Sequence, residues 1–162
     1  MKLAVSSVRD ESDVKLWQNQ YKKTSGAEQA DILHMLSKVS IVKNVQETLL
    51  VPALFAKSRE TRIAAATEIA LMKDKADKKA LVQYLLRAQE ATETESAKEA
   101  ILQTADQAAL DQMVQQFENT GVSNKIAILQ ILSARRDTHH FDFVAGRRVA
   151  QLGTQPELGL RT

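Results

Sequence analysis

Nearly the same hexapeptide occurs twice in this sequence, as KEAILQ at residues 98–103 and as KIAILQ at residues 125–130. A second pair of related segments is ILHMLS at 32–37 and ILQILS at 128–133. Self-similarity with a period of about 20–50 residues is typical of solenoids, in which no single unit buries its apolar face without its neighbours. The repeat therefore predicts a stack of similar units instead of one closed core.

The spacing of the repeat is that of helical pairs. Its equivalent positions are four isoleucines, 37, 32 and 27 residues apart: Ile32, Ile69, Ile101 and Ile128. Gly 5, Pro 2 and 4% aromatic residues leave few helix breakers and few strand formers, which favours helices throughout. Zero Cys excludes disulfides and thiolate metal sites.

Each unit is predicted to contain a buried first helix and an amphipathic second helix. The first helices are apolar on more than one side, so they require neighbours on several sides. The second helices carry apolar residues at i, i+3, i+4 and i+7. These stripes are Leu81, Tyr84, Leu85, Ala88, then Leu110, Met113, Val114, Phe117, and finally Phe141, Val144, Ala145.

Residues with capping side chains mark the predicted helix starts. The predicted caps are Ser25 with Glu28, Ser58, Asp77, Thr92 with Glu95, Asp106, Ser123 and Asp137. Pro52 is expected to bend or end its helix near Val51, because proline has no amide to donate.

The predicted fold is all-α: a right-handed α-solenoid of about four helical pairs plus an N-terminal helix, in a single domain over residues 1–153. The pairs are expected at about 25–57, 58–90, 92–119 and 121–152, the N-terminal helix at about 11–23, and an irregular tail or linker at 154–162. The N-terminal stripe of Val14, Trp17 and Tyr21 fits an end cap or half of a pair.

The segment ETRIAAATEIALMKDKADKKALVQYLL at residues 60–86 resembles a HEAT or HEAT-like repeat, and the resemblance extends more weakly over about 25–152. The matching positions are Arg62, Ala65, Ala66 and Ile69 in the first helix, Asp74 and Asp77 in the turn, and Leu81 and Leu85 in the second helix. HEAT repeats have no invariant catalytic motif, and most such domains are scaffolds that bind proteins. The resemblance thus implies a shape and a protein or peptide partner.

The second helices would line the concave side of such a stack. Their polar positions form the candidate partner-binding face: Gln83, Arg87, Gln112, Gln115, Gln116, Arg147 and Arg148. Amide and guanidinium groups can hydrogen-bond an extended peptide, although any solvated helix face also requires polar residues.

The segment RRDTHHFD at 135–142 contains the side chains most suited to chemistry. Asp137, His139, His140 and Asp142 are potential metal ligands, but adjacent His residues on a helix diverge by about 100°, which disfavours one shared ion. The alternative makes Asp137 a cap and the His residues polar first-turn positions. We therefore predict no metal and no cofactor, and expect His34, which aligns with Gln130, to be partly exposed.

Arg135 and Arg136 suit either phosphates or the end of a helix. A net charge of +2 gives no strong field toward nucleic acid or an acidic membrane. No segment predicts a transmembrane helix, and the absence of an evident signal peptide favours a cytoplasmic location.

The leading hypothesis is a non-catalytic scaffold for a protein or peptide. The alternatives are an accessory module of a larger bacterial enzyme, and a nucleic-acid-binding HEAT-like protein.

Overall fold

The computed structural model describes residues 8–39, 42 and 44–152, so the predicted tail at 154–162 lies outside it. The regular elements of the described residues are all helical, and no strand occurs among them. The all-α prediction is confirmed.

The helices follow one another with short connections. Their bounds are α1 Glu11–Lys23, α2 Gly26–Ser37, η2 Gln46–Leu50, α3 Val51–Ala53, α4 Arg59–Leu71, η3 Lys73–Lys75, α5 Lys78–Arg87, α6 Ala91–Thr104, α7 Gln107–Gln116, η4 Phe117–Asn119, α8 Val122–Ala134 and α9 Phe141–Leu152. α1 covers the residues expected for the N-terminal helix. Each predicted repeat range holds one of α2, α4, α6 and α8, followed by one of α3, α5, α7 and α9.

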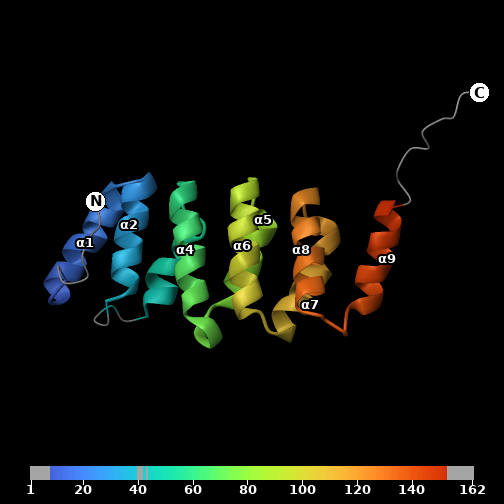
Figure 1. The fold of residues 1–162 in the computed structure, drawn as a ribbon. Helices are drawn as coiled ribbons and strands as arrows, with labels where there is room; N and C mark the ends of the chain where they lie inside the picture. The colour runs from blue at the N-terminus through green and yellow to red at the C-terminus, as the bar shows by residue number, and fades with distance from the viewer. Residues whose placement is uncertain (1–7, 40–41, 43, 153–162) are drawn as a thin grey trace, which may run out of the picture.

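The first helices stand side by side in chain order, with α5 and α7 behind α6 and α8 (Figure 1). α2 contacts α4, α4 contacts α6, and α6 contacts α8, while α5 packs against both α6 and α7. All four repeat isoleucines are at most 1% exposed. One apolar seam therefore runs along the row, because every first helix buries the same position against its neighbours.

α5 and α7 are copies of each other in register, displaced by 29 residues from Lys78–Arg87 to Gln107–Gln116. Each begins with a capping aspartate, as predicted: Asp77 accepts from the Ala80 amide at 2.9 Å and Asp106 from the Ala109 amide at 3.0 Å. Ser58 likewise caps α4 by accepting from the Thr61 amide at 3.3 Å.

The other predicted caps differ from the structure. Ser25 is the N-cap residue of α2 as predicted, but its side chain makes no capping bond. Thr92 and Ser123 lie inside helices that begin at Ala91 and Val122. Asp137 lies four residues before the start of α9 and accepts from the His139 amide instead. The residues after Thr92 form polar contacts with neighbouring helices, Glu93 with Arg62 and Thr94 with Asn124.

The predicted stripe of α9 is only partly right, because Val144 packs against the core but the other two residues do not. Phe141 is 68% exposed and Ala145 is exposed. Phe143 takes the inward position instead, with its ring 5.0 Å from that of Phe117 in an edge-to-face arrangement. The Phe117 ring, just after α7, packs against Phe143 in this way, so Phe143 and not Phe141 is the covered aromatic side chain of α9.

Pro52 was expected to bend or end its helix near Val51, and the helix ends two residues later, at Ala53. The chain accommodates the missing amide with a wider turn just before it, in which the Val51 amide donates to the carbonyl of Gln46.

Candidate binding site

Five of the seven residues of the predicted partner-binding face lie on two helices that touch. α5 and α7 are in contact, and α5 carries Gln83 and Arg87 while α7 carries Gln112, Gln115 and Gln116. Gln83 and Gln112 occupy one equivalent position in the 29-residue register, and Arg87 and Gln116 occupy another. The structure thus brings these side chains onto corresponding faces of neighbouring helices.

Exposure along this face is graded. Arg87, Gln115 and Gln116 are exposed, whereas Gln83 and Gln112 are half-buried. Arg147 and Arg148 belong to α9, but their side chains lie outside the described part of the chain.

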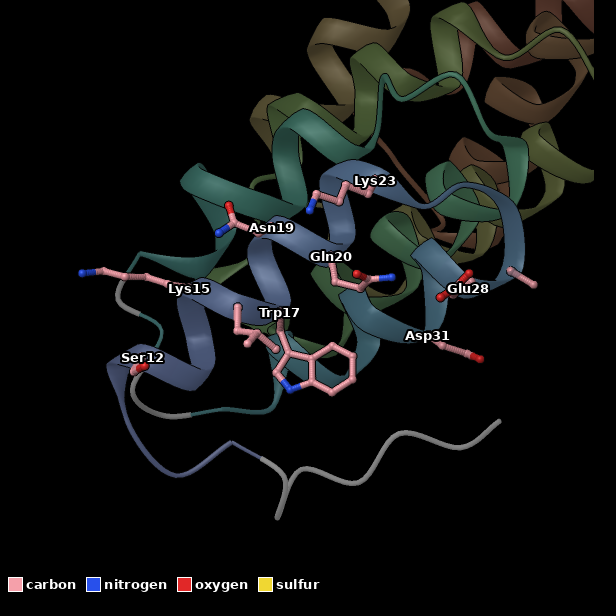
Figure 2. Close-up of a pocket in the computed structure, with 10 residues that line it drawn as sticks. Ser12, Lys15, Trp17, Asn19, Gln20, Lys23, Glu28 and Asp31 are labelled. Carbon is pink, nitrogen blue, oxygen red and sulfur yellow. The ribbon is translucent and has the colours of Figure 1, made fainter.

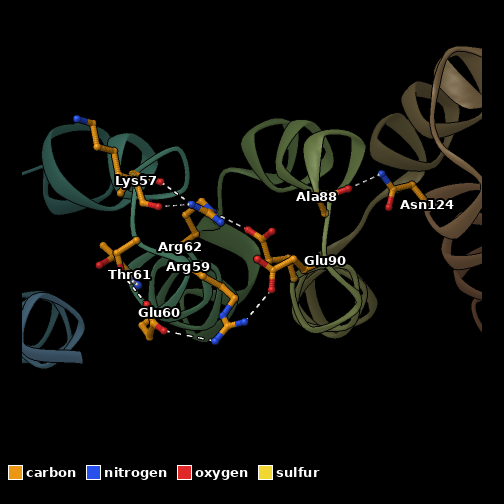
Figure 3. Close-up of polar contacts among 11 residues, drawn as sticks. Lys57, Arg59, Glu60, Thr61, Arg62, Ala88, Glu90 and Asn124 are labelled. Carbon is orange, nitrogen blue, oxygen red and sulfur yellow. Dashed lines mark hydrogen bonds and ion pairs between the residues drawn. The ribbon is translucent and has the colours of Figure 1, made fainter. Parts of the chain in front are cut away.

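Polar side chains link successive first helices near their N-terminal ends. The Arg62 guanidinium of α4 donates to the Glu93 carboxylate of α6 at 2.5 Å and to the carbonyls of Ala56 and Lys57 at 2.8 Å (Figure 3). The bond to Glu93 raises the pKa of Arg62. Glu93 is 3% exposed, so this ion pair is buried on its acidic side.

Two further side-chain hydrogen bonds connect the first helices near their N-terminal ends. Thr61 of α4 donates to the side-chain oxygen of Gln29 of α2 at 2.8 Å, and Thr94 of α6 donates to that of Asn124 of α8 at 3.0 Å. The Asn124 amide then donates to the carbonyl of Ala88 at 3.0 Å (Figure 3). These contacts connect each first helix to the next and satisfy carbonyls at the ends of second helices.

A polar pocket of about 300 Å³ opens beside the Arg62–Glu93 pair. The turn after α3 supplies Phe55, α4 and α6 supply the ion pair, and α5 supplies Tyr84 and Arg87. The Arg87 guanidinium carbon lies 5.1 Å from the centroid of the Phe55 ring, a cation–π distance. The pocket therefore adjoins the predicted partner-binding face, since Arg87 belongs to both.

Tyr84 is the unusual member of this lining. Its side chain is 2% exposed, and among the described residues its hydroxyl is the one buried side-chain polar atom without a hydrogen-bond partner. Burial raises the pKa of Tyr84, the nearby Glu93 carboxylate raises it further, and Arg62 opposes the change. The phenol is consequently neutral at physiological pH and is available as a donor.

The side chains of the Asp- and His-rich segment at 135–142 pair with one another and with α7. His140 pairs through Nδ1 with Asp137, and its Nε2 lies 3.5 Å from an Asp111 carboxylate oxygen of α7. Asp137 also accepts from the His139 amide at 3.0 Å, and although burial opposes it, these bonds lower the pKa of Asp137. Within the described ranges, no three His, Asp or Glu side chains are grouped to hold one metal ion.

Arg135 and His34 have defined partners. The Arg135 guanidinium donates to the carbonyl of Ala105 at 2.6 Å, at the end of α6, which is the helix-end role considered from the sequence. His34 is exposed as expected, with a 61% exposed side chain, and its Nδ1 contacts Glu68 at 2.5 Å.

A larger hollow of about 1030 Å³ lies between α1 and α2 (Figure 2). These two helices stand at one end of the row (Figure 1). Its apolar members include Trp17, half-buried against the core, and Leu16, which is 64% exposed. Lys15 and Lys23 of α1 and Glu28 and Asp31 of α2 also line it.

Comparisons of this chain with protein-family models, with curated proteins and with solved structures found no match. Across residues 8–39, 42 and 44–152, no helix has both the length and the apolar character needed to cross a membrane.

The sequence pattern did not single out these residues as a pocket. It placed Tyr84 in a packing stripe and Arg62 among the repeat positions, and Glu93 matched no predicted site. One sequence signal was available. Tyr84 carries a polar hydroxyl at the position where the equivalent residue of α7 is the apolar Met113.

Proposed function

We propose that this chain is a right-handed α-solenoid of HEAT-like helical pairs that acts as a non-catalytic scaffold. It binds a protein or peptide segment across α5 and α7. The observation that carries this proposal is the shared register of the two helices, which repeats Gln83 as Gln112 and Arg87 as Gln116.

The register suits an extended ligand for a geometric reason. Neighbouring packed helices are about 8–10 Å apart, and an extended chain rises about 3.3 Å per residue. About every third residue of a bound segment would therefore meet an equivalent amide or guanidinium group. Such groups can hydrogen-bond the ligand backbone, so binding does not require one particular sequence.

The solenoid itself is tested by its dimensions. A compact globule of this length has a radius of gyration of about 15 Å. A stack of pairs in the order of Figure 1 is longer, so small-angle X-ray scattering should give a clearly larger value. A radius near that of a compact globule would reject the stack.

The binding face is tested by substituting Arg87, Gln112 and Gln116 together by alanine. We expect loss of partner capture from the native lysate, with an unchanged circular dichroism spectrum. The matched control replaces Thr67, Glu99 and Gln103, exposed polar residues of α4 and α6, and should leave capture intact. Equal capture by both triple variants and the unmodified protein would rule out this face.

A second candidate is an accessory module of a larger bacterial enzyme. The apolar hollow between α1 and α2 favours it, because α2 packs against one further first helix whereas α4 and α6 each pack against two. A preceding helical pair of the same polypeptide would cover Leu16 and Trp17. The natural coding sequence decides this, since a stop codon directly after Thr162 and no upstream coding region would reject it.

A further inference from the structure

The unpaired hydroxyl of Tyr84 is the feature of the polar pocket that implies an occupant. A buried donor without a partner lowers stability, and phenylalanine would pack the same ring without that loss. Native structures seldom leave such a group unpaired unless a water, an ion or a ligand supplies the missing partner. Because the phenol is neutral, its O–H is a donor without a partner, and a group that accepts a hydrogen bond would satisfy it.

The charges around the pocket favour an anion of charge −1. Arg62 and Arg87 contribute two positive charges and Glu93 contributes one negative charge. Arg62 already bonds Glu93 and two backbone carbonyls, whereas Arg87 makes no ion pair with any described residue. One positive charge therefore remains uncompensated at the pocket, and it belongs to the exposed Arg87.

Two side chains of the pocket lining are free to move without any change of the backbone. The Tyr84 hydroxyl is closed to solvent, but Arg87 and Phe55 of the lining are both exposed. Exposed side chains change rotamer within nanoseconds. Rotation of Arg87 away from the Phe55 ring would widen the pocket that Tyr84 lines, and Arg87 would stay part of the same lining.

We propose that this pocket binds a carboxylate carried by a Glu or Asp side chain of the partner segment that lies across α5 and α7. The Tyr84 hydroxyl and the Arg87 guanidinium each donate to a carboxylate oxygen, and the Phe55 ring packs against the aliphatic stem. This inference rests on the proposed function, and it specifies the chemistry that the partner must carry beside α5.

A single carboxylate fits better than a phosphate for two reasons. A phosphate group carries about −1.5 to −2 charge at neutral pH, more than the one uncompensated guanidinium balances. The nearly buried Glu93 carboxylate also lines the pocket and would repel the additional charge. A volume of about 300 Å³ accommodates one acidic side chain.

The test uses the full chain and two matched probes, N-acetyl-glutamate N-methylamide and its glutamine analogue. Amide resonances are followed by two-dimensional NMR during titration to millimolar concentrations. We expect saturable shifts at Tyr84, Arg87 and Glu93 with the glutamate probe, and at least about ten-fold weaker binding of the glutamine probe. Inorganic phosphate, as the third arm, should give no saturable shift at these residues.

Two variants separate this role from simple packing. Tyr84→Phe and Arg87→Gln should each weaken binding of the glutamate probe about ten-fold, while the helical content stays the same. Tyr84→Phe retains the buried ring, so it also serves as a folded reference. The proposal is overturned if the glutamate probe gives no saturable shift, if the glutamine probe or phosphate binds as well, or if Tyr84→Phe binds the probe unchanged.

The proposed pocket and the proposed partner-binding face can be rejected independently of each other. Gln112→Ala combined with Gln116→Ala alters α7 without changing the pocket lining. If this double variant captures partner normally while the probe binds, the α7 part of the proposed face is wrong and the pocket stands. If capture is lost but the probe does not bind the unmodified protein, the pocket is wrong and the face stands.

Discussion

Removal of the Arg62 guanidinium should destabilise the protein more than removal of the Glu93 charge. The two ends of this ion pair differ in burial, since the Glu93 side chain is 4% exposed and that of Arg62 is 21% exposed. Arg62→Met keeps most of the aliphatic stem but leaves a nearly buried carboxylate without its partner. Breaking a buried pair in this way typically costs about 3–5 kcal/mol.

The reverse substitution, Glu93→Gln, leaves a milder defect. Arg62 keeps its bonds to the carbonyls of Ala56 and Lys57, and part of its guanidinium remains in water. The glutamine still offers an oxygen to accept a hydrogen bond. We expect a cost below the about 1.5–3 kcal/mol that a hydrogen bond to a charged group usually contributes, because the bond is weakened and not lost.

The double variant Arg62→Met with Glu93→Gln provides the decisive comparison. It should be more stable than Arg62→Met alone, because the unpaired buried charge has been removed. Urea denaturation followed by far-UV circular dichroism measures the three free energies. For a chain of this size, a loss of about 3–5 kcal/mol corresponds to a fall in melting temperature of roughly 6–20 °C.

Arg59→Met is the matched control. Arg59 pairs with Glu90 at 2.7 Å one turn away, but both side chains are about half exposed, at 46% and 51%. Exposed pairs contribute little, so this variant should unfold close to the unmodified protein. The reasoning is refuted if Arg62→Met and Arg59→Met unfold alike, or if adding Glu93→Gln to Arg62→Met lowers stability further.

Two further predictions concern single side chains. Tyr84→Phe should raise the free energy of unfolding without ligand by about 1 kcal/mol, because it removes a buried unpaired hydroxyl; a lower urea midpoint would show that the hydroxyl has an unrecognised partner. Asp106→Ala should cost about 1 kcal/mol, because it removes the cap of α7. The Ala109 amide lowers the pKa of Asp106, so this stabilisation is complete above the ordinary pKa of 3.8 and is lost as the pH falls through the lower folded value. Acid titration of stability should therefore be shallower for Asp106→Ala below about pH 4, and identical profiles would contradict the assignment.

The repeat and its helices could be predicted from the sequence because they depend on local periodicity. Asp77 and Asp106 cap helices that begin one residue later, and the repeat isoleucines are buried as expected. Such features need only the spacing of apolar residues along one helix and a polar group at its start. The amphipathic character of α5 and α7, and hence the exposed position of Arg87, follows from the same information.

Features at the ends and between units could not be predicted in this way. Phe141 and Phe143 are both aromatic residues near the start of α9, and only the position of the Phe117 ring decides that Phe143 is covered. Thr92 has the sequence context of a helix cap, yet α6 begins at Ala91, and Glu93 and Thr94 bond other helices, which the local pattern does not indicate.

The sequence by itself determined that the chain is helical, where most of its helices lie, and which residues form their apolar faces. Tertiary structure alone determined that Arg62 pairs with Glu93, 31 residues away, and that Tyr84 and Arg87 share one pocket with them. The physical reason is that helix formation and amphipathicity depend on residues within about one turn. A pocket instead depends on how separate helices stack, which the periodicity of any one helix does not encode.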